Sequence, residues 1–133
     1  MARMRIIKPE FFDDVKVAKL VFRERLFYIA LWLLSDDEGY LKNDCRWLKI
    51  KCFPYDDEIN EKTIRCFVNK LVSRKFIVIK NGIINIPNFL KHQRVSHPTP
   101  SKLVEIFEKA CDPCEDQETG KFSRECISKA LEG

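Results

Sequence analysis

Polar side chains that can recognise DNA recur along one helical face between residues 62 and 73. Lys62, Arg65, Asn69 and Ser73 follow one another at intervals of three or four residues, the spacing that brings side chains to one side of a helix. Arginine can donate two hydrogen bonds to guanine, asparagine can pair with adenine, and lysine and serine can reach phosphates. This face therefore predicts contact with duplex DNA. The alternative is that it is the solvent-exposed side of a helix.

Positive charge is concentrated in the segment that contains this face. The chain of 133 residues has a net charge of +4, from 24 lysines and arginines against 20 acids. No Asp or Glu lies between Lys62 and Val104, and this segment holds nine cations, so the remaining residues carry 15 cations against 20 acids, a balance of −5. A solvated face usually mixes both signs, so this distribution favours a phosphate-binding surface.

We therefore expect DNA-binding residues beyond this helical face. The further candidates are other cations of the acid-free segment, together with two arginines near the start of the chain that could form an arm: Lys70, Arg74, Lys80, Lys91, Arg94, Arg3 and Arg5. For the two arginines, the alternative is a solvated terminus.

The first half of the chain predicts four helices. Two short helices are expected after Lys8-Pro9-Glu10 and after Asp13 or Asp14. A long central helix in VFRERLFYIALWLLSDDEG (21–39) is expected to direct an apolar face to the core, namely Phe22, Leu26, Ile29, Ala30, Leu33 and Leu34, widened by Phe27, Leu31 and Trp32. Gly39 ends this helix. A brief strand at 40–41 and a helix capped by Asn43 or Asp44 and closed by Pro54 follow.

The second half predicts a helix and a hairpin. The helix covers residues 60–75 with Asn60 as its cap, and its core face is Ile64, Phe67, Val68, Leu71 and Val72. Two β-branched runs over residues 76–87 are joined by Asn81-Gly82, which favours a type I′ turn because both positions tolerate positive φ. Two short amphipathic helices, over 101–111 and 122–133, end the chain.

This order of elements predicts a mainly α protein with a small β-hairpin (α+β), and specifically a winged helix-turn-helix. We expect a winged-helix DNA-binding domain at residues 1–102 and a C-terminal helical tail at 103–133. In that fold the second helix of the motif enters the major groove and the hairpin wing contacts the adjacent backbone. The stretch after the hairpin is expected to anchor the chain back onto the domain through Asn88, Phe89, His92 and Arg94.

The six cysteines are expected to be reduced thiols because nothing marks the chain as secreted. Cys45, Cys52 and Cys66 fall at helical spacing and are expected to behave as small buried hydrophobes. A zinc site from Cys111, Cys114 and Cys126 with His92 or His97 is the alternative, but no second cysteine pair has a finger-like spacing. We predict no metal and no cofactor.

Other classes of protein are disfavoured. No nucleophile–base pair, phosphate-binding loop or pair of catalytic carboxylates is present at a usable spacing, so we predict a binding protein and not an enzyme. No apolar run approaches the roughly 18 residues of a membrane span, and MARMRIIKPEFF lacks the features of a signal peptide. We therefore expect a cytoplasmic protein without a membrane partner.

Five short sequences carry a family resemblance: IKPEFF, RLFYIALWLLSDDEGYL, FPYDD, IPNFLKHQR and PSK. Occurring in this order over residues 1–102, they resemble the N-terminal domain of phage and prophage replication-initiation (replisome organiser) proteins. The resemblance implies a winged-helix domain that binds origin DNA in a bacterial host cell. In proteins of that family, this domain is usually followed by a separate region that recruits the host helicase machinery.

Two other functions share these features. A transcriptional repressor would use the same DNA chemistry. An interaction protein would instead use the winged helix or the C-terminal helices to bind and inhibit or regulate a host protein. The expected partners are therefore double-stranded DNA and a host replication protein or other host protein, and a homodimer is compatible with each function.

Overall fold

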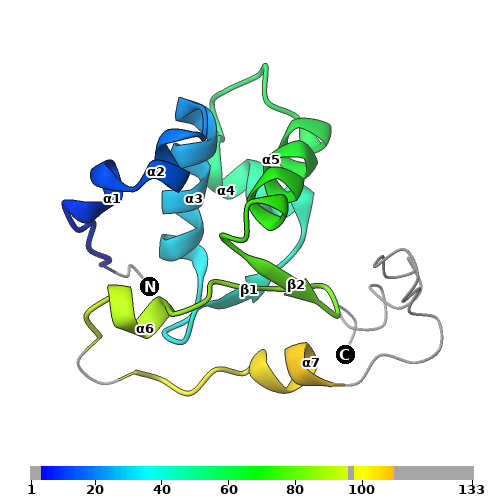
Figure 1. The fold of residues 1–133 in the computed structure, drawn as a ribbon. Coiled ribbons are helices and arrows are strands. Elements are labelled where there is room, and N and C mark those ends of the chain that lie inside the picture. Colours follow the sequence, from blue (N-terminus) through cyan, green and yellow to red (C-terminus); the bar gives the residue numbers. More distant parts are fainter. Residues whose placement is uncertain (1–3, 96–97, 110–133) are drawn as a thin grey trace.

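Helices surround a small sheet in this protein (Figure 1). The computed structural model describes residues 4–95 and 98–109. In chain order the elements are α1 (Glu10–Asp13), α2 (Val15–Ala18), α3 (Phe22–Leu34), β1 (Tyr40–Lys42), α4 (Cys45–Cys52), α5 (Glu61–Ser73), β2 (Val78–Lys80), β3 (Ile83–Asn85), α6 (Phe89–His92) and α7 (Val104–Glu108). The predicted α+β class is confirmed for this part of the chain. The helix expected at 122–133 lies outside the described residues.

The sheet is antiparallel and three-stranded, with β3 in the centre between β1 and β2. β1 pairs with β3 through Tyr40 and Asn85, and β2 pairs with the same strand through Lys80 and Ile83. The β2–β3 turn has positive φ at both central residues, 52° at Asn81 and 74° at Gly82, as a type I′ turn requires. The predicted hairpin is therefore confirmed, and β1 extends it into a sheet.

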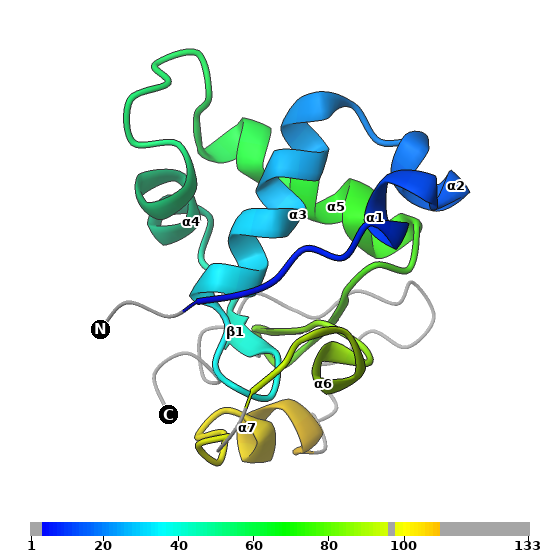
Figure 2. The same cartoon turned by 90° about the vertical axis from the view of Figure 1, so that its left-hand side faces the viewer.

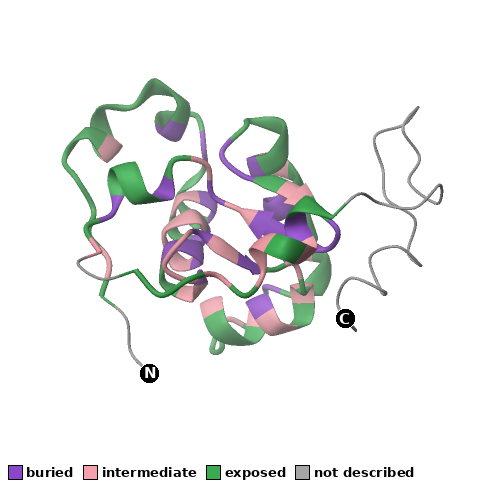
Figure 3. Cartoon of the chain, turned by 90° about the horizontal axis from the view of Figure 1, so that it is seen from below, coloured by how far each residue is buried: buried purple, intermediate pink, exposed green. Residues whose placement is uncertain are grey.

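The core lies where α3, α4 and α5 meet the sheet, and Figure 3 shows the buried residues gathered there. Phe27, Leu48, Ile64, Leu71 and Ile84 are each 0% exposed. Side-chain caps begin the two helices that carry much of this packing. The Asp44 carboxylate accepts from the backbone N–H groups of Arg46 and Trp47 at the start of α4. The Asn60 side chain accepts from the Thr63 N–H at the start of α5, as predicted.

The core face of α3 differs from the predicted one. Phe27 and Leu31 are fully buried and Trp32 is nearly so, whereas Phe22, Leu26 and Leu33 are 81%, 56% and 48% exposed. Their expected place in the core was therefore wrong. Apolar residues lie on every side of this helix, so its periodicity has little contrast, and tertiary packing selects the buried side.

After the sheet, the chain is anchored by Phe89 and Gln93. Phe89 is 3% exposed, and a Cβ added at Gly39 would lie 2.6 Å from the Phe89 Cβ, so the close approach requires a glycine there. Gln93 pairs with the backbone N–H and C=O of Ile6 at 2.9 and 3.0 Å. Asn88, His92 and Arg94, the other expected anchors, are exposed. Helix α6 itself was not predicted, because it starts at Asn88 in a left-handed conformation without a side-chain cap.

Candidate nucleic-acid interface

The outward face of α5 presents the polar residues singled out in the sequence. Ile64, Phe67, Val68 and Leu71 are buried against the core, as predicted. The opposite side carries exposed residues at helical spacing, with Lys70 half-buried beside them: Lys62, Arg65, Asn69, Ser73 and Arg74. Val72, expected in the core, is 38% exposed. The helix is therefore held by one side and leaves the other side accessible to a ligand.

A Schellman motif ends α5 and sets the direction of the hairpin. Lys75 has a φ of 64°, a conformation more usual for glycine, and the N–H of Phe76 donates to Leu71 O at 2.9 Å. The Ser73 hydroxyl donates to Lys70 O at 2.9 Å, so its proton is used within the helix while its oxygen can still accept.

Charges of both signs lie near the N-terminal half of this face. Arg65 lies near the Cys45 thiol of α4. Burial raises the pKa of Cys45, Arg65 lowers it, and the carboxylates of Asp44 and Glu61 raise it. Arg65, Asp44 and Glu61 therefore all lie near Cys45, at the N-terminal half of the face. The C-terminal half, with Lys70 and Arg74, contains no acid.

Cys66 lies on this same outward face and is exposed, so the expectation of a buried thiol was wrong for this residue. It is one turn from both Lys62 and Asn69, because the apolar stripe of α5 passes on the other side. Cys45 and Cys52 are half-buried and pack against the core, closer to the expectation.

The connection between α4 and α5 spans residues 53–60, longer than the turn of about three or four residues that is typical of a helix-turn-helix. Phe53 and Ile59 are 3% and 2% exposed and fix both ends of this loop in the core. The Lys49 ammonium donates to the backbone oxygens of Phe53 and Asp56. These contacts set the position of α5 relative to α4.

The hairpin is covered on one side by α7, which lies below the sheet in Figure 1. Phe107 is 8% exposed, its ring centroid lies 5.2 Å from that of Tyr40, and the Lys80 ammonium lies 5.4 Å from it. The Asn81 side chain donates to Ile106 O at 2.8 Å and to Phe107 O, so the turn residue also caps α7. Lys80 remains exposed, but the turn is not a free tip.

Arg5 does not lie on a DNA-accessible surface. Its side chain is 5% exposed, Nε donates to Trp32 O at 2.9 Å, and Nη2 donates to Ser35 O at 3.2 Å and forms an ion pair with Asp37 at 3.4 Å. The carbonyl groups at the end of α3 attract this guanidinium, because helix C-termini favour cations. The expected arm therefore does not include Arg5, and Arg3 lies outside the described residues.

Lys91 and Arg94 are exposed, but they follow the end of β3 that is remote from the hairpin turn. The backbone oxygen of Lys91 accepts from the Lys8 ammonium at 3.2 Å, which places this region beside the start of the chain. Apart from Arg3 and Arg5, the structure thus divides the predicted residues into two groups. One lies on α5 and the hairpin, and the other comprises Lys91 and Arg94.

Within residues 4–95 and 98–109, no group of three His, Cys, Asp or Glu side chains is placed to hold a metal ion. Cys111, Cys114, Cys126 and His97, the residues of the zinc alternative, lie outside these ranges. In the same part of the chain, no helix combines the length and apolar character needed to span a bilayer.

Comparison of the chain with family models, curated proteins and solved structures found no match.

Proposed function

We propose that this chain binds duplex DNA non-covalently as a replication-initiation protein of the phage type. The observation that carries the proposal is the outward face of α5, where Lys62, Arg65, Asn69 and Ser73 are exposed on a helix whose other side is fixed in the core. Such a helix offers a rigid set of base-reading and phosphate-binding groups to a major groove. The family resemblance of residues 1–102 supports the more specific role in origin binding.

The order of elements supports a winged-helix arrangement. α4 and α5 would form the helix-turn-helix, with α5 as the recognition helix, and β2–β3 would form the wing. The long α4–α5 loop and the cover of α7 on the hairpin are departures from the simplest form of that fold. Lys80 would therefore contact the backbone from the exposed side of β2, and Lys70 and Arg74 would do so from the flank of α5.

Fluorescence anisotropy with a labelled duplex from the native locus and a scrambled duplex tests this function. If about four to six phosphates are neutralised, log K should fall against log salt with a slope of roughly −4 to −5. A flat salt response, or no binding by the full chain at low salt, would contradict the proposal and favour the protein-binding alternative.

Variants of the same face separate base reading from phosphate binding. Arg65→Ala and Asn69→Ala should each cost about 1–3 kcal/mol on the preferred sequence and little on the scrambled one. Lys80→Ala should weaken binding to both duplexes alike. Lys51→Ala, at an exposed position on α4, is the matched control and should bind as the parent chain does. Equal losses on both duplexes for Arg65→Ala would mean that α5 binds backbone without reading bases.

A further inference from the structure

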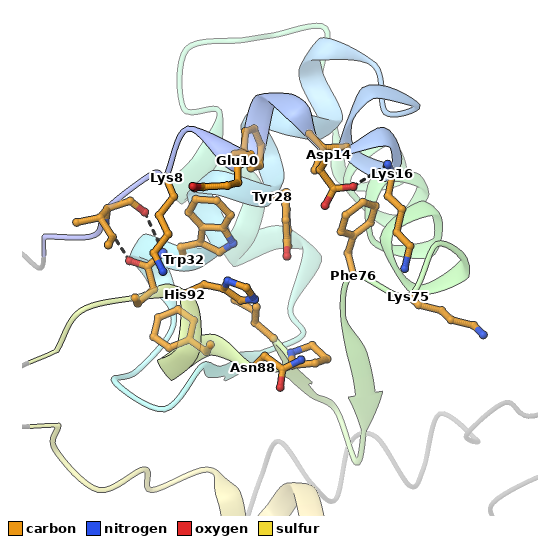
Figure 4. Close-up of a pocket in the computed structure, with 17 residues that line it drawn as sticks. Lys8, Glu10, Asp14, Lys16, Tyr28, Trp32, Lys75, Phe76, Asn88 and His92 are labelled. Atoms are coloured by element: carbon orange, nitrogen blue, oxygen red, sulfur yellow. Dashed lines mark hydrogen bonds between the residues drawn. The ribbon is translucent and has the colours of Figure 1, made fainter.

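A cavity of about 280 Å³ lies between the first two helices and the chain that follows the sheet (Figure 4). Residues 6–17 form one wall, Tyr28 and Trp32 of α3 form the back, and Phe76 with residues 86–93 form the opposite wall. None of the residues that we propose for base reading on α5 lines this cavity. It is therefore a second candidate site.

Aromatic rings make up much of the lining. The ring centroid of Tyr28 lies 5.2 Å from that of Trp32 and 5.0 Å from that of Phe76, and the centroid of Phe11 lies 5.5 Å from that of Trp32. Most of these contacts are edge-to-face or tilted, so the rings support one another as a fixed wall. A wall of this kind favours an aromatic or large apolar side chain as its occupant.

The Tyr28 hydroxyl supplies a polar group at the back of this cavity. In Figure 4 its oxygen points into the space between His92 and Phe76. Burial raises the pKa of Tyr28, a hydrogen bond from Trp32 lowers it, and Asp14 raises it. Among the described residues, no protein group accepts the proton of this hydroxyl. It can therefore donate to a carbonyl or carboxylate of a ligand.

Charge around the cavity is mixed but mainly positive. Lys8, Lys16 and Lys75 contribute cations and His92 contributes an imidazole, against the two carboxylates of Glu10 and Asp14. One carboxylate oxygen of Asp14 already accepts a hydrogen bond from the Lys16 N–H, which caps α2. The wall formed by residues 75–76 and 86–93 contains no acid. Acidic groups beside the anchor of a partner would therefore be favoured.

Exposed apolar side chains on the same segments favour a protein partner over a nucleic acid. Ile6 lines the cavity and is 40% exposed, and Phe12, whose ring contacts Phe11, is 76% exposed. Val15 and Leu90, beside lining residues in the chain, are 68% and 48% exposed. Apolar surface around an anchor pocket is typical of protein interfaces.

We propose that this cavity is a docking site for a protein segment that inserts an aromatic side chain between α1–α2 and α6 and places carboxylates beside it. The ring would pack on the wall of Tyr28, Trp32 and Phe11. A backbone carbonyl or a carboxylate next to the ring would accept from the Tyr28 hydroxyl, and neighbouring acids would face Lys16 and His92. This site does not depend on the DNA-binding function of α5.

Titration of the full chain with short capped peptides, followed by ¹⁵N NMR, tests the proposal. The probe is Glu-Glu-Trp-Glu-Glu, and the controls are Glu-Glu-Ala-Glu-Glu and Lys-Lys-Trp-Lys-Lys. The acidic tryptophan peptide should give saturable shifts at the Trp32 indole N–H and at the amides of residues 88–93. Both controls should bind at least about tenfold more weakly, since one lacks the anchor and the other lacks complementary charge.

Two variants probe the site itself. Tyr28→Phe keeps the ring and removes the hydroxyl, so we expect about fivefold weaker binding, and Lys16→Glu should weaken binding further by reversing a charge at the mouth. Lys51→Glu, an exposed lysine that does not line the cavity, should bind the peptide as the parent chain does. The amide spectrum of each variant reports whether its fold is retained.

Three results would overturn the proposal. The first is an absence of saturable shifts with the acidic tryptophan peptide, or equal binding of the alanine peptide. The second is selective perturbation of the same resonances by hexathymidylate, which would assign the cavity to nucleic acid. The third is a shift of these resonances on dilution of the chain alone, which would assign it to a second copy.

Discussion

Cys52 and Cys66 show how the environment of a single residue sets its chemistry. Burial raises the pKa of the Cys52 thiol to about 12, because the thiolate would lose its hydration in the apolar surroundings of α4. Cys66 lies on the outward face of α5 and is open to water. Both were expected to be buried from their spacing, yet only the thiol on α4 has that environment.

We predict that iodoacetamide at pH 8 labels Cys66 much faster than Cys52 in the native chain. With a pKa of about 12, only about one Cys52 thiol in 10⁴ is ionised at pH 8, and the thiolate is the reactive form. Peptide mapping by mass spectrometry after short pulses measures both rates. Labelling in urea should remove the difference. Equal native rates would mean that the Cys52 thiol is as open to water as that of Cys66.

The same experiment bears on the DNA-binding face. Because Cys66 is one turn from Lys62 and Asn69, a saturating duplex should slow its labelling while leaving Cys52 unchanged. Unaltered labelling of Cys66 in the complex would contradict the entry of α5 into a groove.

At the scale of elements, α3 shows that an apolar residue on a helix is not always a buried one. Leu31 is 0% exposed, whereas Leu26, five positions earlier, is 56% exposed. Every residue from Leu26 to Leu34 is apolar or aromatic, so hydrophobic spacing identifies the helix but not its buried side. The side that carries Phe27 and Leu31 is buried because it faces the end of α4 and the inner side of α5. The Phe27 ring contacts Phe53 at the end of α4 and Phe67 on α5.

Alanine substitutions at these two leucines should therefore differ in cost. Leu31→Ala should lower the free energy of unfolding by about 2–5 kcal/mol, because it leaves a cavity in the core. Leu26→Ala should change it by no more than about 0.5–1 kcal/mol, since the side chain is already largely hydrated. Urea denaturation of both variants measures the difference. A larger cost for Leu26→Ala than for Leu31→Ala would mean that α3 buries the opposite side.

Most of the elements, but not all of their roles, could be predicted from local sequence. The caps Asp44 and Asn60 and the Asn81-Gly82 turn form contacts within a few residues of themselves, so they can be predicted from local sequence. The capping of α7 by Asn81 depends on a carbonyl 25 residues away, and the burial of Arg5 depends on carbonyls 27 and 30 residues away. The spacing of neighbouring residues does not predict these long-range hydrogen bonds. The outward polar face of α5 was predictable because its apolar stripe has strong contrast.

At the scale of the whole molecule, the start of the chain closes the fold. Residues 4–8 pass across the lower end of α3 in Figure 2, where Arg5 bonds to carbonyl groups at the end of that helix. Arg5 also lies over the Phe89 ring, with its guanidinium carbon 5.0 Å from the ring centroid. Next to it, the Ile6 backbone pairs with Gln93, 87 residues away. The first segment therefore joins α3 to α6 and closes one side of the cavity.

Arg5→Ala should consequently act on stability and not on DNA affinity. We expect a loss of about 2–3 kcal/mol in the free energy of unfolding, because a charged donor that is 5% exposed loses several hydrogen bonds at once. Arg23→Ala is the matched control. Its ion pair with Glu58 joins side chains that are 55% and 56% exposed, so its removal should cost about 0.2–1 kcal/mol. Urea denaturation measures both costs. Anisotropy below the unfolding transition should give both variants the duplex affinity of the parent chain. If Arg5→Ala retains its stability but loses duplex affinity, then Arg5 reaches the DNA from a position other than the one at the end of α3.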